Sequence, residues 1–196
     1  MNRLKILLNR KNAVNIILIV FAAVLIISPK AKALVIKAML KTGLMPPPTE
    51  SIAADKSLST LPEIVLKSSD GKILETSRQR GKVLIINFWA TWCPPCIAEM
   101  GSINEMYLHY KTNPKVLIIP VDVDSDFKKS LAFMKNRQYS LPVYQLTSNL
   151  PPGFISDAIP NTIIVNKNGA IKAKHEGAAD YADKAFYNYI DRLIAE

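Results

Sequence analysis

Cysteine is almost absent from the sequence, which has only Cys93 and Cys96 among its 196 residues. A framework of structural disulfides is therefore excluded, because a bond between these two would close a loop too small to constrain the unfolded chain appreciably. Histidine is equally scarce, and His109 and His175 do not have the spacing of zinc ligands. We therefore expect no metal and no cofactor, and the cysteine pair needs another explanation.

Acidic residues are absent before Glu50, although eight of the 25 lysines and arginines lie there. The net charge of +9 is thus a property of the N-terminal segment, since the remaining 17 basic residues are balanced by 16 acidic ones. This distribution does not favour a basic surface for nucleic acid, and we expect no nucleic-acid partner.

Charge of either sign is missing from Asn12 to Pro29, a strongly apolar stretch. Eighteen helical residues reach about 27 Å, just enough for the hydrocarbon core of a membrane. We predict a cytoplasmic tail over 1–12 and a transmembrane anchor over 13–29. The protein would then be single-pass in the inner (cytoplasmic) membrane, with the domain that follows the anchor facing the periplasm or the cell exterior. The alternative is a secretory signal that ends near the AKA of 31–33.

The next segment, 30–57, is predicted to be an interfacial helix and a linker. Within it, ALVIKAMLKTGLM (33–45) places Lys37 and Lys41 one turn apart among apolar residues, a pattern typical of a helix lying in the membrane interface. A helix packed on the following domain, 58–196, is the alternative.

From residue 58 the apolar pattern alternates between strands and helices. Continuous apolar runs typical of buried strands occur in KVLIINFW (82–89) and KVLIIPVDV (115–123), and residues at helical spacing follow each run. The predicted strands are 63–67, 82–89, 115–123 and 141–146, and the predicted helices are 95–111 and 126–138. The core faces of these helices are expected to hold Ile97, Met100, Ile103, Met106 and Tyr107 in the first, and Phe127, Leu131 and Met134 in the second.

The C-terminal part is predicted to be a hairpin followed by a helix. Two apolar runs flank Asn168-Gly169, the strongest short-range hairpin signal. The closing helix, 180–195, would bury Ala185, Phe186, Tyr189, Ile190 and Leu193. With the short strand 141–146 before the hairpin, the order β-α-β-α-β-β-α after an N-terminal extension indicates an α/β domain, with a central mixed sheet and helices on both faces.

The two cysteines lie where a buried strand would lead into a helix. Free N–H groups and the helix dipole favour a thiolate there, so Cys93 is expected to be exposed and activated. Pro94 and Pro95 suit the first turn, which needs no N–H donors. Cys96 would lie behind Cys93, within disulfide reach. This pattern predicts an exchange pair, in which Cys93 attacks a partner disulfide and Cys96 resolves the mixed disulfide.

Three segments carry a resemblance to a known family: NFWATWCPPC (87–96), KVLIIPVDVD (115–124) and AIPNTIIVNKNGAI (158–171). Together they resemble the membrane-anchored thioredoxin-like thiol-disulfide oxidoreductases of the bacterial envelope, which include the disulfide reductases of cytochrome c maturation. The resemblance covers residues from about 58 to the C-terminus and implies a thioredoxin-like fold. It also implies a cis bond before Pro160 and a substrate-binding surface formed by Trp92, Pro94, Pro95, Ile159 and Pro160.

Two positions depart from the family pattern. Asn87, which cannot titrate, stands where cytoplasmic thioredoxins carry a buried aspartate that accepts a proton. Glu99, one turn after Cys96, is the expected replacement in proton transfer; the alternative is an ordinary first-turn glutamate favoured by the helix dipole. Asn161, followed by Thr162, stands where the family often has threonine.

We therefore expect a thiol-disulfide oxidoreductase that reduces protein disulfides outside the cytoplasm. Because Pro95 cannot donate an N–H, the Cys93 thiolate would be weakly stabilised, which corresponds to a low potential and a reductase. A transmembrane electron donor is then needed, and the resemblance implies apocytochrome c as a substrate. The alternatives are a peroxiredoxin-like peroxidase, disfavoured because no arginine lies between Arg80 and Arg137, and a redox-inert tethered binding module, disfavoured because the cysteine pair is intact.

Overall fold

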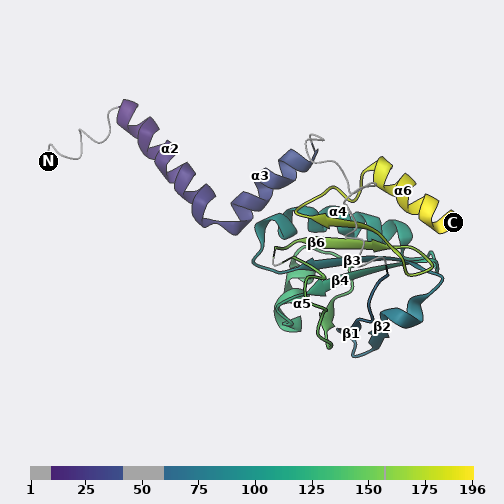
Figure 1. Ribbon diagram of the computed structural model, residues 1–196. Coiled ribbons are helices and arrows are strands. Elements are labelled where there is room, and N and C mark those ends of the chain that lie inside the picture. The colour runs from purple at the N-terminus through teal and green to yellow at the C-terminus, as the bar shows by residue number, and fades with distance from the viewer. Residues whose placement is uncertain (1–9, 42–59, 157) are drawn as a thin grey trace.

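The computed structural model describes residues 10–41, 60–156 and 158–196. The expectations for the beginning of the tail, for the linker and for the domain boundary at 58 concern residues outside these ranges. Two helices, α2 (Arg10–Ile27) and α3 (Pro29–Lys41), precede an α/β domain. Figure 1 shows α2 extending away from the domain, while α3 lies beside it.

A seven-stranded mixed sheet forms the centre of the domain, with the strand order β2-β1-β5-β4-β3-β6-β7. β3 pairs with β4 in parallel and with β6 in antiparallel fashion. The strands are β1 (Val65–Ser68), β2 (Ile73–Glu75), β3 (Val83–Trp89), β4 (Val116–Asp122), β5 (Tyr144–Leu146), β6 (Asn161–Val165) and β7 (Ile171–Glu176). The helices of the domain are α4 (Pro94–Tyr110), α5 (Phe127–Asn136) and α6 (Lys184–Ala195), with a 3-10 turn, η2 (Thr76–Gln79).

The central strand β3 is buried along its whole length, as its unbroken apolar run predicts. Its side chains alternate between two clusters, since successive residues of a strand point to opposite faces. Ile85 and Trp89 belong to one cluster, and Ile86 and Phe88 belong to the other.

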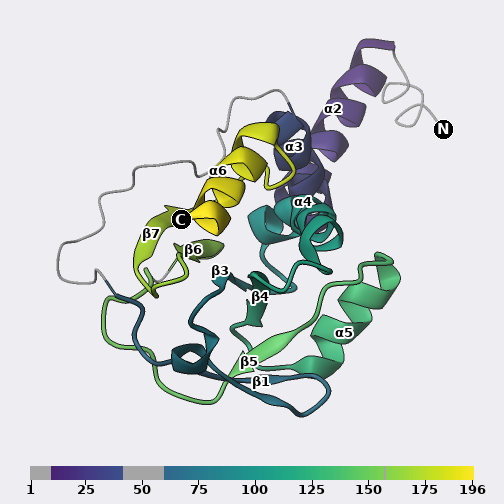
Figure 2. The same cartoon turned by 90° about the vertical axis from the view of Figure 1, so that its right-hand side faces the viewer.

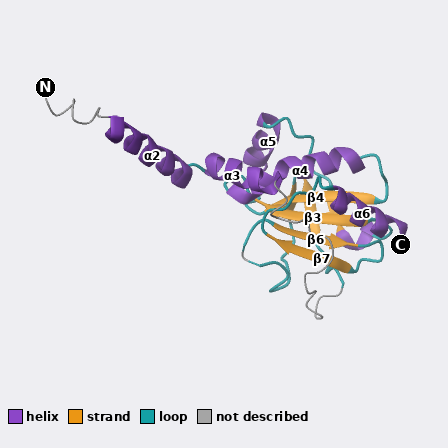
Figure 3. Ribbon diagram, turned by 90° about the horizontal axis from the view of Figure 1, so that it is seen from above, coloured by secondary structure: helices purple, strands orange, loops and turns teal. Residues whose placement is uncertain are grey.

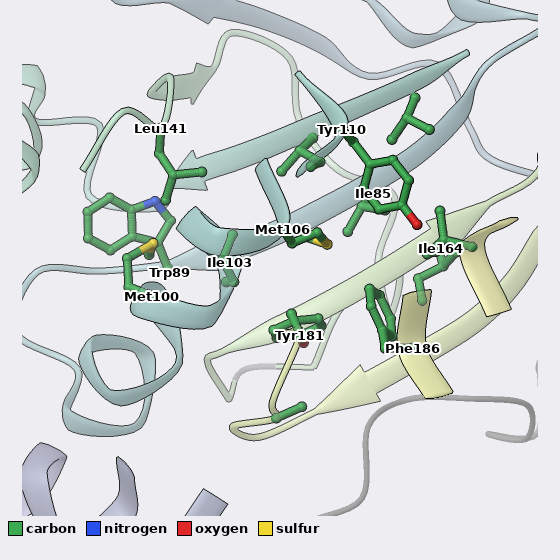
Figure 4. Packing of buried hydrophobic residues seen from close by; sticks show 14 of the residues in the cluster. Ile85, Trp89, Met100, Ile103, Met106, Tyr110, Leu141, Ile164, Tyr181 and Phe186 are labelled. Atoms are coloured by element: carbon green, nitrogen blue, oxygen red, sulfur yellow. The ribbon is translucent and has the colours of Figure 1, made fainter. Parts of the chain in front are cut away.

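The helices of the domain share one face of the sheet. The cluster on that face joins Ile85 of β3 to Met100 of α4, Met134 of α5 and Phe186 of α6. Figure 4 shows side chains of α4 and α6 meeting those of the strands in this cluster, and Figure 2 shows α4 and α6 on the same side of the sheet.

The opposite face is covered without helices. In the described residues, its cluster consists of strand residues and residues of connecting segments, among them Phe154. The prediction of helices on both faces is therefore wrong. The segment that crosses this face between β5 and β6 contains Pro151, Pro152 and Gly153, which disfavour a helix, and it places Phe154 against the sheet instead.

Two predicted core positions are also wrong. Leu131 is 43% exposed, because α5 turns Ser130 and Met134 inward and the Ser130 hydroxyl donates to buried Asp122 at 2.5 Å. Ala185 is exposed because α6 begins at Lys184, so this residue lies in the first turn, before the face formed by the buried residues.

Helix α3 packs on α4, the helix that carries the cysteines (Figure 3). Ala33 and Leu40 are buried against Ile97 and Ala98. Of the two arrangements considered for this segment, the structure thus has the helix packed on the domain. Leu34 on its outer side is 69% exposed, so contact of that side with a membrane surface stays a prediction.

Helix α2 exposes apolar side chains such as Ile17, Ile19 and Phe21. Within the described ranges, no single helix is both long and apolar enough to cross a membrane. Residues Asn12–Val24 and Pro29–Leu40 meet the length and composition only as a pair, across a bend of 89°.

Candidate active site

Cys93 and Cys96 form a disulfide at the start of α4. Cys93 is the N-cap, and Pro94 and Pro95 occupy the first two helical positions, as predicted. Neither proline has an N–H, so the N–H of Cys96 is the donor that reaches Cys93 Sγ, at 3.2 Å. The helix start therefore gives this sulfur a single backbone N–H bond among the described contacts.

Both cysteines are buried in this oxidised form, at 2% exposure for Cys93 and 0% for Cys96. The prediction of an exposed Cys93 is therefore wrong for the disulfide state. Besides its bond to Cys96, Cys93 Sγ lies 3.6 Å from the carbonyl oxygen of Ile159. The Ile159–Pro160 peptide is cis, as the family resemblance implied, and it lies directly beside the disulfide.

The predicted substrate-binding residues lie around this disulfide and differ in their solvent exposure. Trp92 is 57% exposed, and its Nε1–H donates to the Asp124 carboxylate at 2.7 Å, which fixes the indole next to Cys93. Pro94, Pro95 and Ile159 are half-buried, and Pro160 is buried. Their role in binding a partner stays a prediction. The Asp124 anchor was missed because nothing in the sequence pairs two residues 32 positions apart.

Glu99 is fully buried, on α4 and beyond its first turn. An ordinary exposed first-turn glutamate is thereby excluded. Oε1 accepts a hydrogen bond from Asn87 Nδ2 at 2.8 Å, and Oε2 accepts one from the backbone N–H of Ala179 at 3.1 Å. Burial raises the pKa of Glu99 to about 8, because desolvation of the charged form outweighs the two hydrogen bonds that favour it.

Asn87 connects Glu99 to two further buried side chains. Its Nδ2 also donates to Thr162 Oγ1 at 2.9 Å, and the Tyr181 hydroxyl donates to the same Oγ1 at 2.6 Å. Thr162 and Tyr181 were not predicted as members of the site. Thr162 had drawn attention only as the neighbour of Asn161. Tyr181 fell within the predicted helix 180–195, whereas α6 begins at Lys184 and Tyr181 lies in the loop before it.

His109 is exposed on α4, and His175 is half-buried on β7. His109 stacks on Tyr187 with ring centroids 4.7 Å apart, and half-burial lowers the pKa of His175. In the part of the chain that the structure describes, no three His, Cys, Asp or Glu side chains group to hold a metal ion.

Solved structures with the same fold include thiol-disulfide proteins. The thioredoxin domain of a thiol-disulfide oxidoreductase from Bacteroides vulgatus superposes with a TM-score of 0.59 at 19% identity, covering 74% of this chain and 99% of that one. A thiol:disulfide interchange protein of the thioredoxin family from Chlorobium tepidum gives a TM-score of 0.54 at 22% identity, with 72% and 97% covered. At these identities the likeness establishes the thioredoxin-like fold alone.

Sequence similarity is more specific. The thiol-disulfide oxidoreductase ResA of Halalkalibacterium halodurans is 32% identical over 129 residues, which is 63% of this chain and 73% of that protein. ResA of Bacillus subtilis is 32% identical over 114 residues, and the match spans 58% of this chain and 63% of that relative's length, less than two thirds. Residues 56–190 match the Redoxin family. With the CPPC disulfide at a helix start and a thioredoxin-like sheet behind it, the chain belongs to the Redoxin family and is similar to the thiol-disulfide oxidoreductases named ResA.

Proposed function

We propose that this protein is a thiol-disulfide oxidoreductase that reduces protein disulfides through Cys93 and Cys96. The observation that carries the proposal is the disulfide at the N-terminus of α4, next to the cis Ile159–Pro160 bond and one turn from buried Glu99. A disulfide between cysteines three residues apart at a helix start is suited to exchange and contributes little to stability.

The reaction begins with both cysteines reduced. The Cys93 thiol first loses its proton to solvent, and the resulting thiolate attacks one sulfur of the substrate disulfide. The other substrate sulfur leaves with the electron pair and takes up a proton. The Cys96 thiol then loses its proton, and its sulfur attacks Cys93 Sγ. The second substrate sulfur leaves and is protonated in turn. The substrate has gained two electrons and two protons, and Cys93 and Cys96 have lost them as their disulfide forms.

Glu99 is the group that takes the proton from Cys96 in this scheme. The two residues are one turn apart on the same face of α4. The two carboxylate oxygens of Glu99 accept hydrogen bonds from Asn87 and from the N–H of Ala179. A pKa of about 8 for Glu99 is close to the ordinary value of about 8.5 for a thiol. Proton transfer between groups of matched pKa is nearly isoenergetic, which favours acid–base catalysis in both directions.

Weak stabilisation of the Cys93 thiolate supports the reductive direction. The prolines leave Cys96 as the backbone donor to Cys93 Sγ, and fewer donors mean a thiolate of more ordinary pKa. A less stabilised reduced form corresponds to a lower reduction potential, so the pair gives its electrons to substrate disulfides more readily.

The cellular setting completes the proposal. The apolar, charge-free stretch within α2 would anchor the protein in the inner membrane with the domain outside the cytoplasm. Continued reduction of substrates there requires a dithiol donor that carries electrons across the membrane. Apocytochrome c, whose haem-attachment cysteines form a C-x-x-C pair, is the proposed substrate class.

Turnover of insulin disulfides by the reduced full-length chain in detergent tests the central claim. Cys93→Ser should abolish turnover, because it removes the attacking sulfur. Cys96→Ser should instead accumulate the mixed disulfide. Turnover that persists in Cys93→Ser, or an absence of turnover in the wild-type protein, would refute an exchange function. Consumption of hydrogen peroxide in place of insulin disulfides would favour the peroxidase alternative.

A further inference from the structure

A continuous hydrogen-bonded chain of side chains ends on Glu99. The Tyr181 hydroxyl donates to Thr162 Oγ1 at 2.6 Å, Asn87 Nδ2 donates to the same oxygen at 2.9 Å, and Asn87 Nδ2 also donates to Glu99 Oε1 at 2.8 Å. The four side chains are all buried. They come from the loop after β7 and from β6, β3 and α4, so the chain links that loop to the cysteine helix on one face of the sheet.

The same loop holds Glu99 at two other points. The N–H of Ala179 donates to Oε2 at 3.1 Å. The N–H of Tyr181 donates to Ser102 Oγ at 3.1 Å, and that hydroxyl donates to the backbone carbonyl of Glu99 at 2.8 Å. The loop between β7 and α6 therefore contacts both carboxylate oxygens, directly or through side chains, and also the backbone of this one residue.

The orientation of the Asn87 amide decides whether its nitrogen or its oxygen faces the Glu99 carboxylate. Both of the hydrogen bonds found for Asn87 are made by Nδ2, and Oδ1 is buried without a hydrogen-bond partner. A rotated amide would place Oδ1 against the carboxylate, which a charged Glu99 would disfavour. The acceptor oxygen of Thr162 opposes this rotation because it binds the nitrogen side of the amide.

Tyr181 in turn holds the Thr162 hydroxyl. Its ring is fully buried and meets Phe186 edge to face, with centroids 5.2 Å apart (Figure 4). Its hydroxyl donates to Thr162 Oγ1 at 2.6 Å and so occupies one lone pair of that oxygen. Tyr181 lies 82 residues after Glu99 in the chain. It is nevertheless connected to the Glu99 carboxylate through the side chains of Thr162 and Asn87.

We propose that Tyr181 is a positioning residue that, through Thr162 and Asn87, keeps a hydrogen-bond donor on the Glu99 carboxylate and so sets the pH at which Glu99 exchanges a proton with Cys96. This inference rests on the proposed role of Glu99 in disulfide exchange. According to this proposal, a residue of the loop after β7 controls the proton exchange of Glu99 on α4.

The polar and titratable groups that face Glu99 come from three elements. They are Asn87 on β3, the Ala179 N–H and the Tyr181 phenol on the loop after β7, and Cys96 on α4 itself, which does not titrate in the disulfide. Neither a basic side chain nor a second carboxylate contributes to the shift of the Glu99 pKa within the described residues. Burial, and then proximity to Glu99, raise the pKa of Tyr181 well above its ordinary value, so the phenol stays neutral between pH 6 and 9.5.

The test measures the Glu99 pKa without catalysis. The oxidised full-length chain in detergent, with ¹³C-labelled glutamate, is titrated by NMR, and the Glu99 carboxyl signal is identified by its loss in Glu99→Gln. Tyr181→Phe and Thr162→Val should each raise the pKa by roughly half to one pH unit, since each weakens the hydrogen bond to the charged form. The double variant should shift no further than Thr162→Val alone, because both changes break one chain.

Two variants serve as matched controls. Tyr110→Phe removes the hydroxyl of another buried tyrosine, which donates to Asp191 at 2.9 Å, and should leave the Glu99 pKa unchanged. Thr162→Ser keeps the acceptor oxygen and should retain the wild-type value. If Tyr181→Phe fails to fold, the comparison of Thr162→Val with Thr162→Ser still decides the question.

The pH profile of insulin reduction separates this inference from the proposed function. A profile that moves upward with Tyr181→Phe, in parallel with the NMR value, supports the inference. If Glu99→Gln changes the profile while Tyr181→Phe and Thr162→Val move neither the profile nor the NMR value, the inference is wrong and the role of Glu99 stands. If Glu99→Gln leaves the profile unchanged, its catalytic role is refuted, and the proposed control of proton exchange falls with it.

Discussion

Asn87 Nδ2 lies 2.8 Å from Glu99 Oε1, and both side chains are buried. By the family resemblance, Asn87 stands where cytoplasmic thioredoxins carry a buried aspartate. Its amide donates to a carboxylate that comes from the cysteine helix instead. The proton acceptor proposed for Cys96 thus lies on the helix, and the strand residue Asn87 is its hydrogen-bond donor.

Glu99→Gln should slow disulfide exchange and change its pH dependence. In the wild-type protein, reduction of substrate by the dithiol form should accelerate as the pH rises through about 8, because ionised Glu99 accepts the Cys96 proton. General base assistance is typically worth about 10²–10⁴-fold, and that contribution disappears in the variant. Stopped-flow measurement between pH 6 and 9.5 tests this, with exposed Glu105→Gln on the same helix as the control. A loss smaller than about threefold would assign Glu99 a purely structural role.

The buried carboxyl should also make stability depend on pH. Its pKa is raised from 4.5 to about 8 on folding, so below pH 4.5 it is protonated in both states and has no electrostatic cost. Between these values the unfolded state loses the proton first, and the free energy of unfolding should fall by a few kcal/mol as the pH rises, then level off above about 8. Urea unfolding of the oxidised protein at pH 5, 7 and 9 measures the slope. Glu99→Gln should flatten it; an equal slope in both proteins would contradict the assignment.

The reduction potential should be low. With Cys96 as the backbone donor to Cys93 Sγ, we expect a value closer to the roughly −270 mV of thioredoxin than to the roughly −120 mV of a strong oxidant. Equilibration of the full-length chain with glutathione buffers measures it. A potential near −120 mV would overturn the reductive direction but leave exchange chemistry intact.

Packing of α3 on α4 should contribute to stability. Leu40→Ala removes a buried side chain that contacts α4 and should lower the free energy of unfolding by about 2 kcal/mol, at the low end for a buried leucine because the site can relax. Leu34→Ala, on the exposed side of the same helix, should change it by less than about 0.5 kcal/mol. Equal effects of the two changes would mean that α3 does not dock as described.

The proposed topology predicts that a reporter active only outside the cytoplasm works when fused after Glu196, and that a reporter active only in the cytoplasm does not. The flanking charges alone do not decide this, since four basic residues lie on each side of the apolar stretch. N-terminal sequencing of the purified protein is the companion measurement. A chain that begins at Leu34 would replace the anchor with a cleaved signal.

Much of the site could be predicted from the sequence because its residues are neighbours in the chain. Cys93, the two prolines and Cys96 follow a buried strand directly, and local rules for helix starts place them at the first turn of α4. The cis bond at Pro160 was predicted by resemblance, since a proline before a strand does not by itself specify an isomer.

What the local pattern determined was therefore the order of the elements, the buried strands and the position of the disulfide. Tertiary structure decided which residues surround them. The covering of one face by a Pro-rich segment, the burial of Cys93 and the exposure of Leu131 depend on how elements pack, which a periodic pattern does not encode. Glu99 shows the difference most clearly: its place after Cys96 is local, but the burial that raises its pKa depends on the packing of distant elements. The two hydrogen bonds that partly offset this burial come from Asn87 on a distant strand and Ala179 on a distant loop. Helical and strand periodicity arise from contacts a few residues apart, whereas desolvation and buried hydrogen bonds require segments that meet only in the folded chain.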